Sequence, residues 1–188
     1  MDKYFMNFNI PVLLTVIRII LIPFFVLFFY LPFYGSSFIS ALLFVIGALT
    51  DWFDGFLARL WHQTTKFGAF LDPIADKIMV ITALVIVIEY YHIWWVTLPS
   101  ITMIIREFII TSIRGWLLAG GNHNFITVSI LGKFKTASQM IALVGLLWRP
   151  NNQIEIFAII LLYITVILTF WSMLQYLLSL WYNLKNKN

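Results

Sequence analysis

The sequence has 188 residues, of which 62% are hydrophobic and only 11% are charged, and its mean hydropathy is +0.93. Soluble globular domains carry about 25% charged residues, so this composition excludes a soluble protein and indicates an integral membrane protein. The 12 lysines and arginines behind the net charge of +4 are too few and too embedded to indicate a nucleic-acid partner. The sequence has no cysteine, which excludes disulfides and thiol chemistry.

Six apolar stretches are long enough to cross a bilayer core about 30 Å thick, which takes about 20 helical residues. They cover residues 10–31, 36–58, 73–91, 93–118, 126–148 and 154–182. The first stretch is too long for the apolar region of a cleavable signal peptide, so we expect it to be the first span. Residues 1–8 mix aromatic and charged side chains and are expected to lie along the interface as a short helix. We therefore predict an all-α polytopic membrane protein with six transmembrane helices and a single membrane-embedded domain, residues 1–188.

Basic residues fall mainly on one side of the predicted spans. That side holds Lys3, Arg59, Lys66, Arg114, Lys133, Lys135, Lys185 and Lys187, whereas the other side holds Arg149. Loops rich in lysine and arginine stay in the cytoplasm. Both termini and the loops at 59–72 and 114–135 are therefore predicted to be cytoplasmic, in a multi-pass protein of the cell membrane whose basic face contacts anionic lipids.

Four of the eight acidic residues lie between positions 51 and 76. Asp51 and Asp54 are three residues apart at the end of the second predicted helix, so they share one helix face. Asp72 and Asp76 are four apart at the start of the third helix and also share a face. Asp72 is a possible N-cap there, with Pro73 in the first turn. The two pairs are expected to face each other at the depth of the lipid headgroups.

Converging carboxylates can all stay ionised in a partly apolar site only if positive charge compensates them. Oxygen ligands without His or Cys favour hard cations such as Mg²⁺, Mn²⁺ or Ca²⁺, and two metal ions can hold both oxygens of a phosphoryl transfer. Nearby, Gly55 and Gly68 leave space for a bulky ligand, and Arg59 could hold phosphate oxygens. One intramembrane aspartate could serve helix packing, but two such pairs indicate a functional site.

The run from Asp51 to Asp76 reads DWFDGFLARLWHQTTKFGAFLDPIAD. It resembles the D-x2-D-G-x2-A-R-x8-G-x3-D-x3-D signature of the CDP-alcohol phosphatidyltransferases, and all eight fixed positions match. Three further segments are similar to bacterial members that make phosphatidylglycerol phosphate. These segments are NIPVLLTVIRIILIPFF at 9–25, IIREFIITSIRGW at 104–116 and GKFKTASQM at 132–140. The resemblance therefore covers nearly the whole chain.

The resemblance implies a six-helix membrane enzyme with the fold of this family, acting as a homodimer. Its substrates would be CDP-diacylglycerol and sn-glycerol 3-phosphate, and its products phosphatidylglycerol phosphate and CMP, in phospholipid synthesis. Its cofactors would be two divalent cations, Mg²⁺ or Mn²⁺. The metal ligands implied by position are Asp51, Asp54, Asp72 and Asp76. Asp76 would also accept the proton of the attacking hydroxyl, and the residues implied at the CDP moiety are Gly55, Arg59, Thr65 and, by giving clearance, Gly68.

The acceptor phosphate needs a cationic pocket of its own, separate from the metal ions. Its candidates are Arg106, Arg114 and Lys135. Arg106 and Arg114 are eight residues apart, which places them within about 80° of each other around a helix. Arg106 could instead form a structural ion pair, because Glu107 follows it and could pair with either arginine.

Two polar residues in adjacent turns of the first predicted helix, Thr15 and Arg18, complete the candidates for CDP-diacylglycerol binding. Arg18 is expected to point into the helix bundle. It could reach either the nucleotide or a carboxylate, and the sequence leaves both possibilities open.

Two other functions are compatible with the aspartates. The same chemistry could use another acceptor, such as inositol phosphate, serine or phosphatidylglycerol, because the signature does not distinguish acceptors. A divalent-cation transporter would use the carboxylates as a permeation site. That function predicts polar residues continuing across the membrane, whereas the outer halves of the predicted spans are almost bare of charge.

Overall fold

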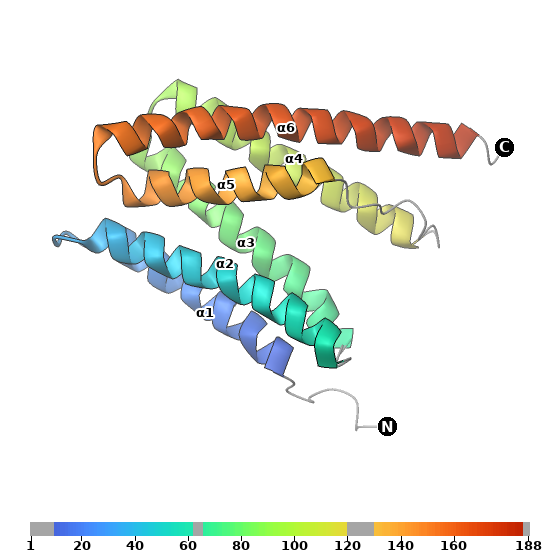
Figure 1. Ribbon diagram of the computed structural model, residues 1–188, viewed down its shortest axis with the longest axis horizontal. Coiled ribbons are helices and arrows are strands. Elements are labelled where there is room, and N and C mark those ends of the chain that lie inside the picture. The colour runs from blue at the N-terminus through green and yellow to red at the C-terminus, as the bar shows by residue number, and fades with distance from the viewer. Residues whose placement is uncertain (1–9, 62–65, 120–129, 186–188) are drawn as a thin grey trace.

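Six helices make up the described part of the chain, which covers residues 10–61, 66–119 and 130–185 of the computed structural model (Figure 1). They are α1 (Ile10–Tyr30), α2 (Ser36–Trp61), α3 (Lys66–Tyr91), α4 (Trp94–Ala119), α5 (Ile130–Trp148) and α6 (Asn152–Lys185). Within 51–61 and 66–73 only the backbone is described. The prediction of an all-α chain with six helices is confirmed, and the expected interfacial helix at 1–8 lies outside the described residues.

The connections between the described helix pairs are short. His92 and Ile93 alone separate α3 from α4, and His92 has a φ of 50°, a left-handed conformation that commonly ends helices. Gly35, with a φ of 92°, reverses the chain between α1 and α2, where glycine avoids the strain of a side chain. The side-chain oxygen of Asn151 accepts a hydrogen bond from the Ile154 backbone at 2.9 Å, which caps the start of α6.

Helix α3 begins earlier than the sequence predicted. It starts at Lys66, so Asp72 lies inside the helix and is not its N-cap, and Pro73 is not in the first turn. The prediction used Pro73 as a start signal, because proline is best accommodated at the beginning of a helix and disfavours helix before it. Residues 66–71 are mostly apolar and have no turn signal other than one glycine, so the helix continues through them. Both aspartate pairs therefore lie within helices.

The other described limits are close to those predicted. Helix α2 extends to Trp61, beyond the expected end at 58, and α6 extends to Lys185, beyond 182. The expected start of the fifth helix at 126 falls among residues 120–129, outside the described part of the chain.

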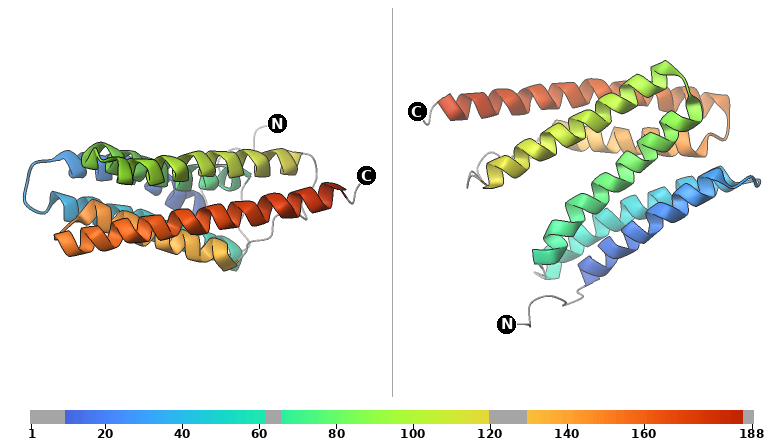
Figure 2. Two further views of the ribbon diagram at one scale, coloured as in Figure 1. Left: turned by 90° about the horizontal axis from the view of Figure 1, so that it is seen from above. Right: turned by 180° about the vertical axis from the view of Figure 1, so that it is seen from behind.

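The helices pack around one apolar core. Helix α1 lies along α2 and α5 along α6, while α3 contacts α1 and α5, and α4 covers α3 and α6 (Figures 1 and 2). The Phe25 and Phe44 rings meet edge to face in this core, with centroids 6.0 Å apart. Leu84, Leu143 and Leu162 are buried beside them. The core draws residues from all six described helices, including Val96 and Met103 of α4.

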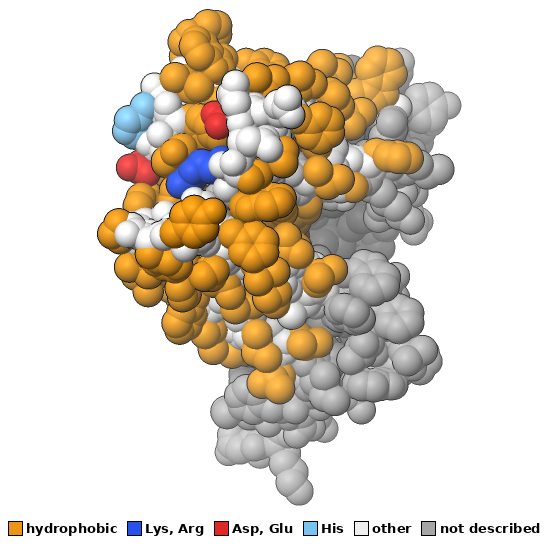
Figure 3. Space-filling model, turned by 60° about the vertical axis from the view of Figure 1, so that its left-hand side comes forward, with side chains coloured by type: hydrophobic (Ala, Val, Ile, Leu, Met, Phe, Trp, Pro, Cys, Tyr) orange, Lys and Arg blue, Asp and Glu red, His pale blue; other side chains and the backbone are white. Residues whose placement is uncertain are grey.

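The start of α1 and the end of α6 lie at the same end of the bundle, which is also where α2 ends and α3 begins (Figure 1). We call it the aspartate end, because the signature aspartates lie on those parts of α2 and α3. At the opposite end, the Arg149 guanidinium lies 3.7 Å from the Tyr90 ring centroid and 4.4 Å from that of Phe29. Tyr30 donates a hydrogen bond to Glu89 at 2.8 Å. Figure 3 shows that opposite end, where a few charged side chains interrupt a mostly hydrophobic surface.

The outer surface suits a lipid environment. Three helices among the described residues contain segments long and apolar enough to cross a membrane, namely Leu13–Tyr30, Trp94–Ile113 and Asn152–Gln175. Two shorter apolar helical segments are Ser36–Thr50 and Phe134–Trp148. Large apolar side chains such as Leu27, Phe108 and Ile167 are exposed on the outside of the bundle, where lipid tails would solvate them. The chain is therefore a polytopic membrane protein.

Candidate functional site

The four signature aspartates lie on two helices that contact each other. Asp51 and Asp54 belong to α2, and Asp72 and Asp76 belong to α3. Because both segments are α-helical, each pair occupies one helix face. The side chains of the first three lie outside what the structure describes, whereas Asp76 is partly buried. The convergence of the four carboxylates on metal ions thus stays a prediction.

The remaining signature residues are placed by the backbone alone. Gly55 and Arg59 lie in the last turns of α2 and Gly68 in the first turn of α3, while Thr65 falls outside the described residues. No group of three His, Cys, Asp or Glu side chains that could hold a metal occurs among the side chains that the structure describes. The donor set formed by the four aspartates contains only oxygen, which fits Mg²⁺ or Mn²⁺.

Thr15 and Arg18 of α1 are buried, with 2% and 0% of their surfaces exposed. The prediction that Arg18 points into the bundle is confirmed. Gly47 of α2 has no Cβ, and two side chains lie close to the position that a Cβ would take there. Cγ of Arg18 lies 3.8 Å from that position, and Sδ of Met79 on α3 lies 2.7 Å from it. The stem of Arg18 therefore packs beside Gly47, where α2 has no side chain and the Met79 side chain of α3 fills the space.

This packing places Arg18 close to the aspartate pairs. Gly47 precedes Asp51 by four residues, and Met79 follows Asp76 by three, so each is about one helical turn, ~5.4 Å, from a signature aspartate. The guanidinium of an arginine can span that distance. Both partners expected for Arg18, the nucleotide and a carboxylate, are compatible with this position.

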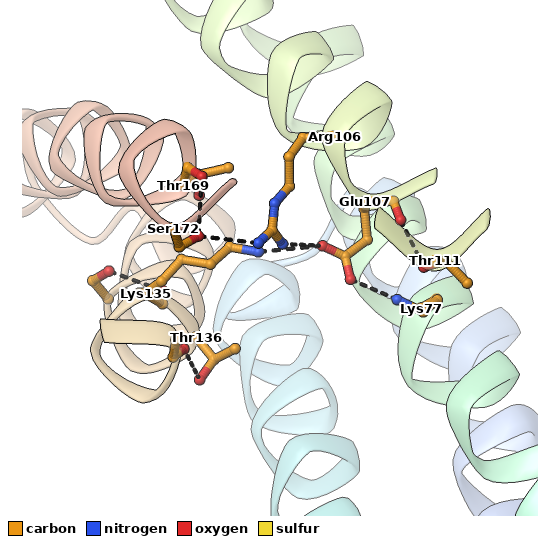
Figure 4. Close-up of polar contacts among 10 residues, drawn as sticks. Lys77, Arg106, Glu107, Thr111, Lys135, Thr136, Thr169 and Ser172 are labelled. Atoms are coloured by element: carbon orange, nitrogen blue, oxygen red, sulfur yellow. Dashed lines mark hydrogen bonds and ion pairs between the residues drawn. The ribbon is translucent and has the colours of Figure 1, made fainter. Parts of the chain in front are cut away.

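A second polar group lies where α3, α4 and α5 meet (Figure 4). Glu107 of α4 accepts a hydrogen bond from Lys77 of α3 through Oε1, at 2.6 Å. Its Oε2 accepts from Arg106 at 3.1 Å and from Lys135 of α5 at 3.2 Å. We call these four residues the Glu107 cluster. The side chain of Lys135 is the most buried of the four, with 6% exposed, and that of Lys77 is the most open, with 28%.

Helix α6 also contributes to the Glu107 cluster. Nη2 of Arg106 donates to Oγ of Ser172 at 3.1 Å, and Ser172 in turn donates to the backbone carbonyl of Thr169 at 3.0 Å (Figure 4). Arg106 is therefore held both by the carboxylate beside it on α4 and by a hydroxyl of α6. These bonds fix the direction of its guanidinium.

The structure brings together two of the three residues predicted for the acceptor phosphate. Arg106 and Lys135 come from different helices and meet at Glu107. The side chain of Arg114 lies outside what the structure describes. The alternative predicted for Arg106, an ion pair with Glu107, is also present. The ion pair and a role in phosphate binding are compatible, because the single negative charge of Glu107 does not neutralise the three cations that contact it.

Sequence reasoning missed two members of this site, Lys77 and Ser172. Lys77 had a signal, because it directly follows Asp76 within an apolar helix, and charged residues in such positions are functional candidates. Ser172 had none, because nothing in the sequence shows that its face of α6 lies against α4.

The charge of the Glu107 cluster favours an anionic ligand. Three cations against one carboxylate leave a formal charge of +2. Repulsion between like charges is stronger in a partly buried site than in water, so a further anion would stabilise the arrangement. A phosphate monoester carries about −1.5 to −2 at neutral pH. The Glu107 cluster can therefore bind such a group.

Known proteins resemble this chain over nearly its whole length. The sequence profile of the CDP-alcohol phosphatidyltransferase family matches residues 8–171. A protein of Yersinia enterocolitica named CDP-diacylglycerol–glycerol-3-phosphate 3-phosphatidyltransferase is 59% identical, over 95% of this chain and 98% of its own. Proteins of the same name from Pectobacterium atrosepticum and Haemophilus influenzae are each 60% identical, over 92% of this chain and 94% and 93% of their own.

Proposed function

This chain belongs to the CDP-alcohol phosphatidyltransferase family, and we propose that it transfers the phosphatidyl group of CDP-diacylglycerol to sn-glycerol 3-phosphate, releasing CMP. The observation that carries the proposal is the 59% to 60% identity, over 92% to 95% of the chain, to relatives named for both substrates. The product, phosphatidylglycerol phosphate, makes this a membrane enzyme of phospholipid synthesis. The Glu107 cluster supports the choice of a phosphorylated acceptor.

The four signature aspartates, Asp51, Asp54, Asp72 and Asp76, are the proposed ligands of two divalent cations, Mg²⁺ or Mn²⁺. The family is generally dependent on divalent cations. Their oxygen-only donor set and their placement as two same-face pairs on adjoining helices support this assignment. When bound, such ions neutralise the charge of a pyrophosphate.

The proposed reaction is the attack of an alcohol on a phosphate. The acceptor hydroxyl oxygen attacks the β-phosphorus of CDP-diacylglycerol, the bond from that phosphorus to the oxygen of CMP breaks, and the hydroxyl proton passes to Asp76. A carboxylate within hydrogen-bond reach of the hydroxyl can act as this general base. Arg59 and Arg18 would hold the nucleotide end of the lipid. The other residues proposed at CDP-diacylglycerol are Thr15, Gly55, Thr65 and Gly68.

The Glu107 cluster is the proposed site of the acceptor phosphate, with Arg114 as a further candidate. Arg106 and Lys135 supply charge from α4 and α5, and Lys77 adds a third cation beside the proposed base. The Cα atoms of consecutive residues are about 3.8 Å apart, so Lys77 and Asp76 occupy the same part of α3. One small acceptor could therefore place its phosphate on the cluster and its hydroxyl near Asp76.

The enzyme is proposed to act as a homodimer of single membrane-embedded domains in the cell membrane. The distribution of lysine and arginine supports placing both termini and the aspartate end in the cytoplasm. A water-soluble acceptor would reach the site from that side, and CDP-diacylglycerol would enter from the lipid. The family resemblance supports the dimer.

A direct test offers the purified protein CDP-diacylglycerol and Mg²⁺ with one acceptor at a time. The acceptors are sn-glycerol 3-phosphate, inositol phosphate, serine and phosphatidylglycerol, and the measurement is CMP release. We expect release with sn-glycerol 3-phosphate. Release with another acceptor alone would reassign the substrate, and no release with any of them would contradict the enzymatic function.

A further inference from the structure

Glu107 is the one member of the Glu107 cluster that contacts all the others. Its carboxylate joins cations from three helices, α3, α4 and α5. Without it, three like charges would repel one another in a partly buried site. Their mutual spacing therefore depends on this carboxylate.

We propose that Glu107 is a positioning residue that holds Lys77, Arg106 and Lys135 in place for the acceptor phosphate and sets the charge of the pocket to match a phosphate monoester. This inference rests on the proposed function, and it names the feature that selects the acceptor class. Glu107 itself does not touch the reacting atoms.

The geometry leaves the cations able to bind both Glu107 and a ligand. Lys77 uses Oε1 of Glu107, whereas Arg106 and Lys135 share Oε2, so the carboxylate spreads them over its two oxygens. A lysine ammonium has three donors, and Lys77 and Lys135 each direct one of them to Glu107. Lys77 has the most exposed side chain of the three, with 28% exposed against 13% for Arg106 and 6% for Lys135. It therefore offers the open side by which a phosphate would enter.

The charge of the pocket separates classes of acceptor. A formal charge of +2 matches a phosphate monoester, which carries close to two negative charges at neutral pH. A phosphodiester such as phosphatidylglycerol carries one negative charge, and serine carries no phosphate. The cluster thus favours acceptors with a terminal phosphate over both.

The primary test is Glu107→Gln, which keeps the shape of the side chain and removes its charge. We expect KM for sn-glycerol 3-phosphate to rise at least about tenfold, the effect of losing one charge-assisted hydrogen bond at the ligand. KM for CDP-diacylglycerol should stay within about twofold of wild type. Glu107→Asp, which keeps the charge, should recover part of the loss. The matched control is Glu89→Gln at the opposite end of α3, where an exposed carboxylate contacts Tyr30, and it should leave both KM values unchanged.

Two small phosphate esters test, independently of the KM values, whether the charge of the pocket matches that of a phosphate monoester. Methyl phosphate carries two charges and dimethyl phosphate one, and each is measured as a competitor of sn-glycerol 3-phosphate. The wild-type enzyme should prefer methyl phosphate, and Glu107→Gln should lose most of its affinity for methyl phosphate. If Glu107→Gln does not fold, Lys77→Gln is used in its place. The Lys77→Gln variant removes one cation and leaves the ion pairs of Glu107 with Arg106 and Lys135.

Several outcomes would overturn the inference. A lower KM for sn-glycerol 3-phosphate in Glu107→Gln would show that the carboxylate only opposes the ligand. Equal increases in both KM values would show a purely structural role, and unchanged kinetics in Lys77→Gln would remove that lysine from the pocket. These results all require an active wild-type enzyme, so they are distinguishable from failure of the proposed function, in which wild type would release no CMP.

Discussion

Asp76 lies on α3 directly before Lys77, so it is the signature aspartate next in sequence to a member of the Glu107 cluster. We expect Asp76→Asn to retain CDP-diacylglycerol binding and to lose about 10²- to 10⁴-fold in turnover, the range for a positioned general base. Asparagine has nearly the same size but cannot accept the proton. Lipid binding and CMP release measured on the same preparation would check this, and wild-type turnover in the variant would remove the assigned role.

Lys135 is the most buried cation of the Glu107 cluster. Lys135→Ala should raise KM for sn-glycerol 3-phosphate about 10- to 100-fold, because it removes a charged donor from the phosphate. KM for CDP-diacylglycerol should change much less. Phe134→Ala is the matched control, since the neighbouring Phe134 is 64% exposed whereas Lys135 is buried. Equal effects of Lys135→Ala on the two substrates would contradict the assignment.

Residue types and spacings in the sequence predicted part of the site at this scale. The aspartate spacing predicted two same-face pairs, and the polar residues of apolar helices marked Arg18, Arg106 and Lys135. The meeting of Lys135 with Arg106 at Glu107 was not predictable, because helical periodicity gives the direction of a side chain and not the neighbouring helix it meets. Lys77 was missed although a charged residue within an apolar helix is a signal of function.

At the scale of the element, apolar runs of about 20 residues, the length that crosses a bilayer, located the six helices of the described chain. They fail at the start of α3, where Pro73 predicts a boundary but the helix begins at Lys66. A proline inside a helix removes one hydrogen bond and crowds the carbonyl four residues earlier. A helix packed against its neighbours tolerates that loss, so a single proline is a weak boundary signal.

The close contact between α5 and α6 depends on the absence of a side chain at Gly145. A Cβ added to Gly145 would lie 2.7 Å from Cβ of Ala158, which is too close and cannot be relieved by rotating a side chain. Gly145→Ala should therefore lower the free energy of unfolding by about 1–3 kcal/mol, as overpacking does, seen as a lower Tm in detergent.

Gly115→Ala is the matched control for this helix contact. No atom lies within 4 Å of the position a Cβ would take on Gly115, and alanine is favoured over glycine in a helix by up to about 1 kcal/mol. Its Tm should be unchanged or raised. Equal decreases in Tm for both variants would show that Gly145 is not at a close contact.

At the scale of the whole molecule, the two ends of the bundle differ in chemistry. The aspartate end carries the signature and most of the basic residues, whereas the opposite end is tied by Arg149 against Tyr90 and Phe29 and by the Tyr30–Glu89 hydrogen bond. Charge counting predicts which loops share a side, and this assignment stays a prediction. The order in which the helices pack was not predictable, because apolar faces directed to lipid and to protein have similar compositions in a membrane protein.

The cysteine-free sequence permits a direct test of orientation. In intact cells, a membrane-impermeant maleimide should label Tyr34→Cys, because Tyr34 is fully exposed in the turn between α1 and α2. Asn188→Cys at the C-terminus should be labelled only after the membrane is opened, as the positive-inside rule requires. Labelling of Asn188→Cys in intact cells would reverse the proposed topology.

The most direct test of the central claim is the stoichiometry of the reaction. Purified protein is given CDP-diacylglycerol, Mg²⁺ and labelled sn-glycerol 3-phosphate, and CMP and labelled lipid are measured together. We predict one phosphatidylglycerol phosphate for each CMP, with both products lost on chelation of the metal or in Asp51→Ala. CMP release without labelled lipid would contradict phosphatidyl transfer. Formation of both products by Asp51→Ala in the amounts made by wild type would contradict transfer at the aspartate site.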